Sequence, residues 1–143
     1  MNIRITKSRI AYGLLAVFTA AFSMTSAQAE EVKVTLSGAA ETPPVTTSAS
    51  GTAKFTIGAD KSVSGEIKTS GIEGTAAHIH LGAPGEKGPP VITLVKDEKG
   101  VWKVPANSKL TDDQLASFKA GNLYVNVHSA EHQPGEIRGQ IKP

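Results

Sequence analysis

Leu123-Tyr124-Val125-Asn126-Val127-His128 is the stretch that decides the fold, because apolar and polar residues alternate along it without a break. Successive side chains of a β-strand point to opposite faces. The three apolar residues are therefore expected to face a core, while Tyr124, Asn126 and His128 lie on the opposite face. This period of two is typical of a half-buried antiparallel strand.

Shorter alternating stretches occur on both sides of this one and are separated by Gly, Pro and Ser. They cover residues 32–36, 53–57, 63–67, 77–81 and 137–141. Residues 91–95 are more continuously apolar and predict a strand that is buried on both faces. In total the sequence predicts an all-β protein, an antiparallel β-sandwich or barrel of about seven or eight strands.

One segment departs from the alternating pattern and predicts a single short helix. Thr111-Asp112-Asp113-Gln114 has the form of a capping box, and its acidic residues suit the positive end of a helix dipole. Gly121 is placed to end the helix. We expect this helix over residues 112–120.

The first 29 residues have the pattern of a secretory signal peptide. A basic start is followed by an apolar run, and Ala27-Gln28-Ala29 has the small-x-small form of a cleavage site. We therefore expect residues 30–143 to form one β domain that is periplasmic or secreted. No stretch is long and apolar enough to predict a membrane span.

The charge of the expected domain gives no support for nucleic-acid or anionic-lipid partners. Without residues 1–29 the chain has 12 Lys and Arg against 13 Asp and Glu, with no basic cluster. The chain contains no cysteine, and both methionines lie in the expected leader. Any metal ion in the domain would therefore be held by nitrogen and oxygen ligands.

All four histidines lie in two short tracts, His78-Ile79-His80 and His128-Ser129-Ala130-Glu131-His132. His78 and His80 share one face of their predicted strand, and His128 lies on the polar face of its own. If the two strands are neighbours, three imidazoles share one surface that suits Cu²⁺, with Zn²⁺ as the alternative. His132 lies outside the strand, and either it or a water would fill a fourth position.

Other polar residues have simpler interpretations. Glu136 is a candidate metal ligand or histidine partner, although it could instead pair with Arg138 two residues along the strand. Glu41 precedes Pro43-Pro44 and is expected to be a loop carboxylate without a partner. Tyr124 is expected to be a packing residue. The sequence has no nucleophile-elbow serine and no phosphate-binding glycine loop, which argues against hydrolases and nucleotide enzymes.

Four motifs together resemble the CHRD domain family over roughly residues 32–141. They are Leu36-Ser37-Gly38-Ala39-Ala40-Glu41-Thr42-Pro43-Pro44-Val45, Ala77-His78-Ile79-His80-Leu81-Gly82, Gly121-Asn122-Leu123-Tyr124-Val125-Asn126-Val127-His128-Ser129 and Gly135-Glu136-Ile137-Arg138-Gly139-Gln140-Ile141. The resemblance implies a compact all-β domain of the single, exported bacterial type. His78, His80 and His128 match the family's histidine positions, whereas His132 is more variable there.

Three functions follow as hypotheses. The first is an exported metal-binding protein, with copper favoured over zinc, which acts in metal sequestration or tolerance. The second is a non-catalytic interaction or structural module, with another periplasmic protein as its candidate partner. The third is an enzyme similar to a copper superoxide dismutase, and a non-catalytic role is favoured over this one.

Overall fold

The computed structural model describes residues 28–143 of the 143-residue chain. Nearly all of the expected signal peptide, residues 1–29, therefore lies outside the described residues. Within the described part, no helix has the length and apolarity that a membrane crossing requires.

The described chain forms nine strands and one α-helix, with a short 3₁₀ turn at Gly38–Ala40. The strands are β1 (Glu30–Ser37), β2 (Ser50–Ile57), β3 (Val63–Ser70), β4 (Gly74–Leu81), β5 (Pro90–Thr93), β6 (Val95–Glu98), β7 (Val101–Lys103), β8 (Leu123–Ser129) and β9 (Ile137–Ile141), and the helix is α1 (Asp112–Lys119).

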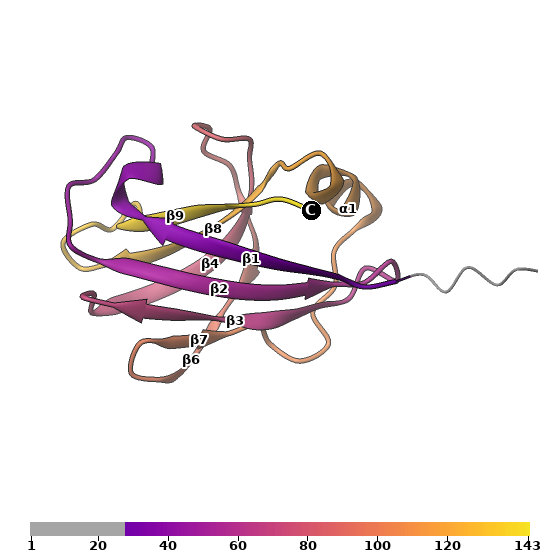
Figure 1. The fold of residues 1–143 in the computed structure, drawn as a ribbon, viewed down its shortest axis with the longest axis horizontal. Coiled ribbons are helices and arrows are strands. Elements are labelled where there is room, and N and C mark those ends of the chain that lie inside the picture. Colours follow the sequence, from indigo (N-terminus) through magenta and orange to yellow (C-terminus); the bar gives the residue numbers. More distant parts are fainter. Residues whose placement is uncertain (1–27) are drawn as a thin grey trace, which may run out of the picture.

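All nine strands belong to one antiparallel sheet with the order β5-β4-β8-β9-β1-β2-β3-β7-β6. The two ends of this order, β5 and β6, are consecutive in the chain and are separated only by Leu94. The Leu94 N–H still donates to the carbonyl of Ala77 in β4, at 2.9 Å. The sheet is therefore curled into a nearly closed barrel, with β1, β2 and β3 in front of β4 and β8 in Figure 1.

The core fills the space inside the curled sheet. Its fully buried members come from opposite sides of the barrel and include Leu36, Phe55, Ile67, Ile79, Val125 and Ile137. Burial of such apolar side chains is the main stabilising contribution to the fold. Helix α1 lies at one end of the barrel (Figure 1) and buries Phe118.

The helix forms where its capping pattern predicts. The Thr111 side chain accepts a hydrogen bond from the Gln114 N–H, and the Gln114 side chain accepts one from the Thr111 N–H. This capping box satisfies backbone donors that have no partner within the first turn. Gly121 follows the helix with φ of +74°, a conformation that favours glycine.

The structure confirms an all-β antiparallel fold with one short helix and corrects one strand. The prediction that residues 91–95 form a strand buried on both faces is wrong. Only Ile92 and Leu94 of this stretch are buried, and the Val95 side chain is 57% exposed. The chain changes partner at Leu94, from β4 to β7: β5 buries only Ile92, and every residue of β6 is exposed.

Candidate metal centre

The histidines of both tracts lie on adjacent strands. β4 pairs with β8, so that His78 is opposite Asn126, and His80 is opposite Tyr124. His128 is opposite Ala76, two residues before His78, and so lies diagonally across from it. Side chains at directly opposite and diagonal positions on one face of a sheet are within reach of one another. This register brings His78, His80 and His128 together.

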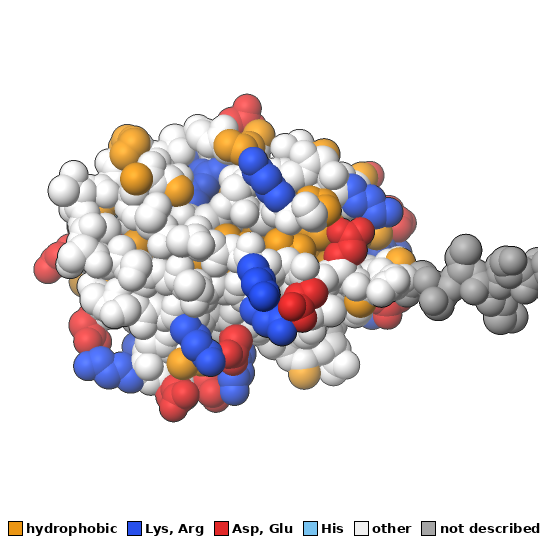
Figure 2. Space-filling view, in the orientation of Figure 1, with side chains coloured by type: hydrophobic (Ala, Val, Ile, Leu, Met, Phe, Trp, Pro, Cys, Tyr) orange, Lys and Arg blue, Asp and Glu red, His pale blue; other side chains and the backbone are white. Residues whose placement is uncertain are grey.

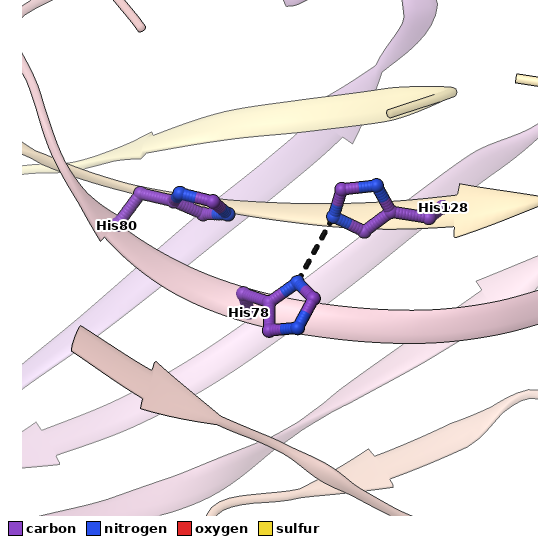
Figure 3. A group of neighbouring side chains, drawn as sticks. All are labelled: His78, His80 and His128. Carbon is purple, nitrogen blue, oxygen red and sulfur yellow. Dashed lines mark hydrogen bonds between the residues drawn. The ribbon is translucent and has the colours of Figure 1, made fainter. Parts of the chain in front are cut away.

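The three imidazoles are close enough to form one group. One nitrogen from each ring lies within 4.8 Å of a nitrogen from the other two. The shortest separation, 3.0 Å, joins His78 Nδ1 to His128 Nε2 and is drawn as the dashed line in Figure 3. Tetrahedral ligation with bonds of 2.0–2.1 Å needs nitrogens about 3.3 Å apart. The His78–His128 pair already lies near this separation, and the nitrogens of all three rings lie within 4.8 Å.

Two backbone carbonyls fix the orientation of two of the rings. His80 Nδ1 lies 2.9 Å from the Gly88 carbonyl, and His128 Nδ1 lies 2.7 Å from the Gln133 carbonyl. A carbonyl oxygen only accepts, so each Nδ1 must carry a proton. In the neutral rings the lone pair is then on Nε2, which is the arrangement that protein metal sites use to orient histidine ligands. His128 Nε2 accepts from His78 Nδ1, and His80 Nε2 has no partner among the described residues.

The burial of the site favours the uncharged form of its imidazoles. Burial lowers the pKa of His78 and of His80 below the usual 6.5, and the neighbouring His128 lowers both further. In His80 the hydrogen bond to Gly88 opposes this trend only in part. A histidine must be neutral to bind a metal ion, so this environment prepares both rings as ligands near neutral pH.

A stack of three side chains supports His80 from behind. The His80 ring is parallel to that of Tyr124, with centroids 4.7 Å apart, and the Arg138 guanidinium carbon lies 3.5 Å from the Tyr124 centroid. Arg138 also donates to the carbonyls of Glu86 (2.6 Å) and Ala83 (3.0 Å). Arg138 thereby holds the 82–89 loop, whose Gly88 carbonyl orients His80. Tyr124 does pack, as expected, but against a candidate ligand.

One sequence-based interpretation of an acidic residue is wrong. Glu136 does not pair with Arg138: its Oε1 accepts from the Thr47 hydroxyl at 2.6 Å, and hydrogen bonds from Ser129 and Thr47 outweigh burial and lower its pKa. Glu41 lies in a loop, as expected, and its Oε1 has no hydrogen-bond partner among the described residues. What the sequence does not show is that Glu41 is buried next to Asn126, and this burial raises its pKa. The loop folds back over the sheet, which strand periodicity does not reveal.

His132 is not a member of the histidine group. Its backbone N–H donates to the Ser129 hydroxyl at 3.1 Å, and its carbonyl accepts from the Gly135 N–H at 3.0 Å. These contacts build the turn between β8 and β9. This turn also supplies the Gln133 carbonyl that orients His128.

Comparison with known proteins identifies the domain. The family model described as CHRD domain matches residues 32–141, which is most of the chain. The chain belongs to the CHRD domain family. No curated protein and no solved structure matches it. In this CHRD domain the four family-like motifs lie together, because the chain opening at Glu41, the His-x-His strand and the two closing strands meet on one side of the barrel.

Sequence reasoning missed the groups that surround the histidines. Gly88 and Gln133 act through backbone carbonyls, which no side-chain pattern predicts. One signal was present in the sequence: Gly82-Ala83-Pro84-Gly85-Glu86-Lys87-Gly88-Pro89-Pro90 directly follows the His-x-His tract. Pro fixes φ and Gly permits the positive φ that tight turns need, as at Gly85 with +79°, so this composition is typical of a turn-rich surface loop.

Proposed function

We propose that this CHRD domain is an exported protein that binds one Cu²⁺ ion through His78, His80 and His128 and so sequesters copper. The His-triad geometry supports binding of a metal ion. The choice of copper, the exported location and the role in metal tolerance are further parts of the proposal.

The observation that carries the proposal is the state of His80 Nε2. This nitrogen is buried and has no hydrogen-bond partner among the described residues. A buried polar atom without a partner costs about 1–3 kcal/mol. Because Nδ1 of the same ring already donates to Gly88, Nε2 offers a lone pair to the space between the histidines. A metal ion would supply the missing partner.

The chemistry of the available ligands favours Cu²⁺. The described domain offers imidazole nitrogens and carbonyl or carboxylate oxygens, and the chain has no cysteine. Soft sulfur ligands select Cu⁺, whereas nitrogen and oxygen sites bind Cu²⁺ more tightly than the other divalent first-row metals. Zn²⁺ is the competing ion, because three histidines also suit its tetrahedral geometry.

Competitive titration of the purified protein with Cu²⁺ and Zn²⁺ tests the proposal. We expect one Cu²⁺ per chain with a dissociation constant below about 1 μM, corresponding to more than about 8 kcal/mol of binding free energy. His80→Ala should weaken binding at least 100-fold, whereas the matched control His132→Ala should leave it within twofold. Binding weaker than micromolar, or equal loss in both variants, contradicts the proposed site.

Growth of the source cells on copper tests the physiological role. Deleting the gene should lower copper tolerance, the unchanged gene should restore it, and the His80→Ala form should not. Restoration by His80→Ala at equal protein level contradicts sequestration through this site. The location is tested in the same cells by fractionation, with recovery outside the cytoplasm as the expected result.

A further inference from the structure

A carboxamide lies among the three histidines. Asn126 faces His78 across the β4–β8 pair and Arg138 across the β8–β9 pair, and it lies on the same face of β8 as His128. The residue is only 2% exposed, and within residues 28–143 its Oδ1 has no hydrogen-bond partner. Asn126 is thus a buried polar side chain whose oxygen lacks the partner that burial normally requires.

Glu41 lies on the nitrogen side of this carboxamide. A Cβ atom added at Gly135 would collide with both Glu41 Oε1 and Asn126 Nδ2, so both atoms lie next to Gly135. Glu41 Oε1 is itself buried and has no hydrogen-bond partner among the described residues, so it can accept from an amide nitrogen placed there. An amide nitrogen donates and a carboxylate accepts, so this orientation is the favoured one. It turns the other end of the carboxamide, Oδ1, away from Glu41.

The amide oxygen faces His80. Asn126 is opposite His78, so its side chain lies diagonally across from His80 on the same face of the β4–β8 pair. Against the larger effect of burial, the Asn126 side chain raises the pKa of His80, as an oxygen directed at the ring would. However, His80 Nδ1 already holds its proton for the Gly88 carbonyl, so the neutral ring presents a lone pair at Nε2. Asn126 Oδ1 presents lone pairs as well. Two buried acceptors with no hydrogen between them are stabilised by a positive group placed where both can reach it.

We propose that Asn126 Oδ1 is a fourth protein ligand of the metal ion and that Glu41 is its positioning residue. This inference rests on the proposed function, because it adds to the same histidine site. The ion would have three nitrogen ligands and one oxygen ligand. A carboxamide oxygen is a hard, neutral donor, which favours Cu²⁺ or Zn²⁺ over Cu⁺. The half-buried His78 and His128 rings leave the remaining position on the solvent side.

Substitution of Asn126 tests the ligand. Asn126→Leu removes the oxygen and keeps the branching and the number of heavy atoms of the side chain, and Asn126→Asp keeps an oxygen at the same place. The control Asn122→Leu makes the same change immediately before β8. We expect Cu²⁺ affinity to fall 10–100-fold in Asn126→Leu, to stay equal or increase in Asn126→Asp, and to stay within twofold in the control.

Pulsed electron paramagnetic resonance in D₂O separates a lost ligand from a general loosening. The Cu²⁺ form of Asn126→Leu should gain one exchangeable water ligand over the unchanged protein, because water fills the vacated position. The Asn126→Asp form should gain none. An unchanged water count and an affinity within twofold in Asn126→Leu overturn the inference; that result indicates a buried water between Oδ1 and Nε2. If Asn126→Leu does not fold, a tenfold loss of affinity in folded Asn126→Asp overturns it.

A double-mutant cycle tests the positioning role of Glu41. The Glu41 carboxylate can only accept hydrogen bonds, whereas the glutamine of Glu41→Gln can also donate. The Asn126 carboxamide could then flip and exchange the positions of its oxygen and nitrogen. When Asn126 is kept, we expect Glu41→Gln to weaken Cu²⁺ binding about tenfold. In the Asn126→Leu background the same change should have no effect on affinity. Equal effects in both backgrounds overturn the assignment of Glu41.

The two proposals fail in different ways. If the unchanged protein does not bind Cu²⁺ or Zn²⁺, the proposed function fails, and the inference fails with it. If the unchanged protein binds and His80→Ala does not, the histidine site stands. In that case the Asn126 and Glu41 variants alone decide the inference.

Discussion

Strands β2 and β8 follow the same rule in the sequence and reach different surroundings in the structure. Both alternate apolar and polar residues. In β2 the apolar residues face the core, while Thr52 and Lys54 point outward and are exposed. In β8 the polar residues Tyr124 and Asn126 are buried as well, at 3% and 2% exposure.

The difference comes from the loops and not from the strands. The outward face of β1, β2 and β3 carries Lys and acidic side chains among neutral ones, and no histidine is visible from this side in Figure 2. There Lys54 pairs with Glu31 at 2.8 Å while both side chains remain about half exposed. On the β4–β8–β9 side, the 82–89 loop covers the polar residues and supplies carbonyl partners.

This contrast teaches what a covering loop adds to an alternating strand. Exposed charge pairs contribute little to stability, because water screens them and solvates each partner separately. Under a loop the same kinds of residue must find fixed partners, since water no longer satisfies them. Fixed partners hold the rings in one orientation, which a binding site requires.

Removing the buried arginine should give the largest effect on stability. Arg138→Met leaves the carbonyls of Glu86 and Ala83 without their donor, which we expect to cost about 3 kcal/mol of unfolding free energy. Urea unfolding of the metal-free protein measures the loss. The matched exposed-face change Lys68→Met should stay within about 0.5 kcal/mol. Similar losses of unfolding free energy in the two variants would contradict the view that the covered face contributes more to stability than the exposed face.

Adding one methyl group at Gly135 should have the next largest effect. Gly135 has φ of +134°, and a Cβ there would meet the Glu41 and Asn126 side chains. We expect Gly135→Ala to lower the unfolding free energy by about 2 kcal/mol through backbone strain and these contacts. On the opposite side of the barrel, Thr52→Ala should change it by less than about 0.5 kcal/mol. Thermal unfolding of both variants checks the pair.

The covered face should also respond to pH. Because the pKa values of His78 and His80 are lowered below 6.5 in the folded protein, the unfolded chain takes up protons first as the pH falls. The stability of the metal-free protein is therefore greatest above pH 6.5 and declines below it, until the folded pKa values are reached. The variant with His78→Gln and His80→Gln should lose this decline.

The unfolding midpoints of the unchanged protein and of the double histidine variant are measured at several pH values. The difference between them at each pH gives the contribution of the two histidines to stability. The comparison is necessary because Glu41 acts in the opposite direction. Its raised pKa lowers stability as the pH rises above 4.5. Thr93→Ala, an exposed change opposite His78, should keep the slope of the unchanged protein. An identical slope in the double histidine variant would contradict the argument.

The smallest effect is expected from an ion pair on the exposed face. Lys68 lies 3.1 Å from Glu66, and the lysine side chain is 67% exposed. Lys68→Gln should leave the unfolding midpoint unchanged at physiological salt, because such pairs are screened. Repeating the measurement at low and high salt checks this. A clear salt-dependent loss would show that the exposed face contributes more than its geometry indicates.

The sequence predicted the elements of the fold well where a local rule applied. The strand at residues 123–128 and the capping box at Thr111 each depend on neighbouring residues only, and both form as expected. The expectation that this strand is half-buried is wrong, because its polar face is covered as well. The stretch 91–95 was interpreted wrongly because its burial depends on a change of partner at Leu94. A change of partner is a property of the closed sheet and leaves no local pattern.

By itself the sequence determined most of the strands, the helix and the strand faces on which His78, His80 and His128 lie, because side-chain direction in a strand follows from its period of two. It did not predict β6 and β7, which are short and largely exposed. Only the tertiary structure decided that β4 and β8 are neighbours and that His132 stays apart. It also decided that Glu41, Asn126 and the Gly88 carbonyl surround the rings. Strand pairing and loop closure join residues that are far apart in the chain, and local sequence patterns do not predict such contacts.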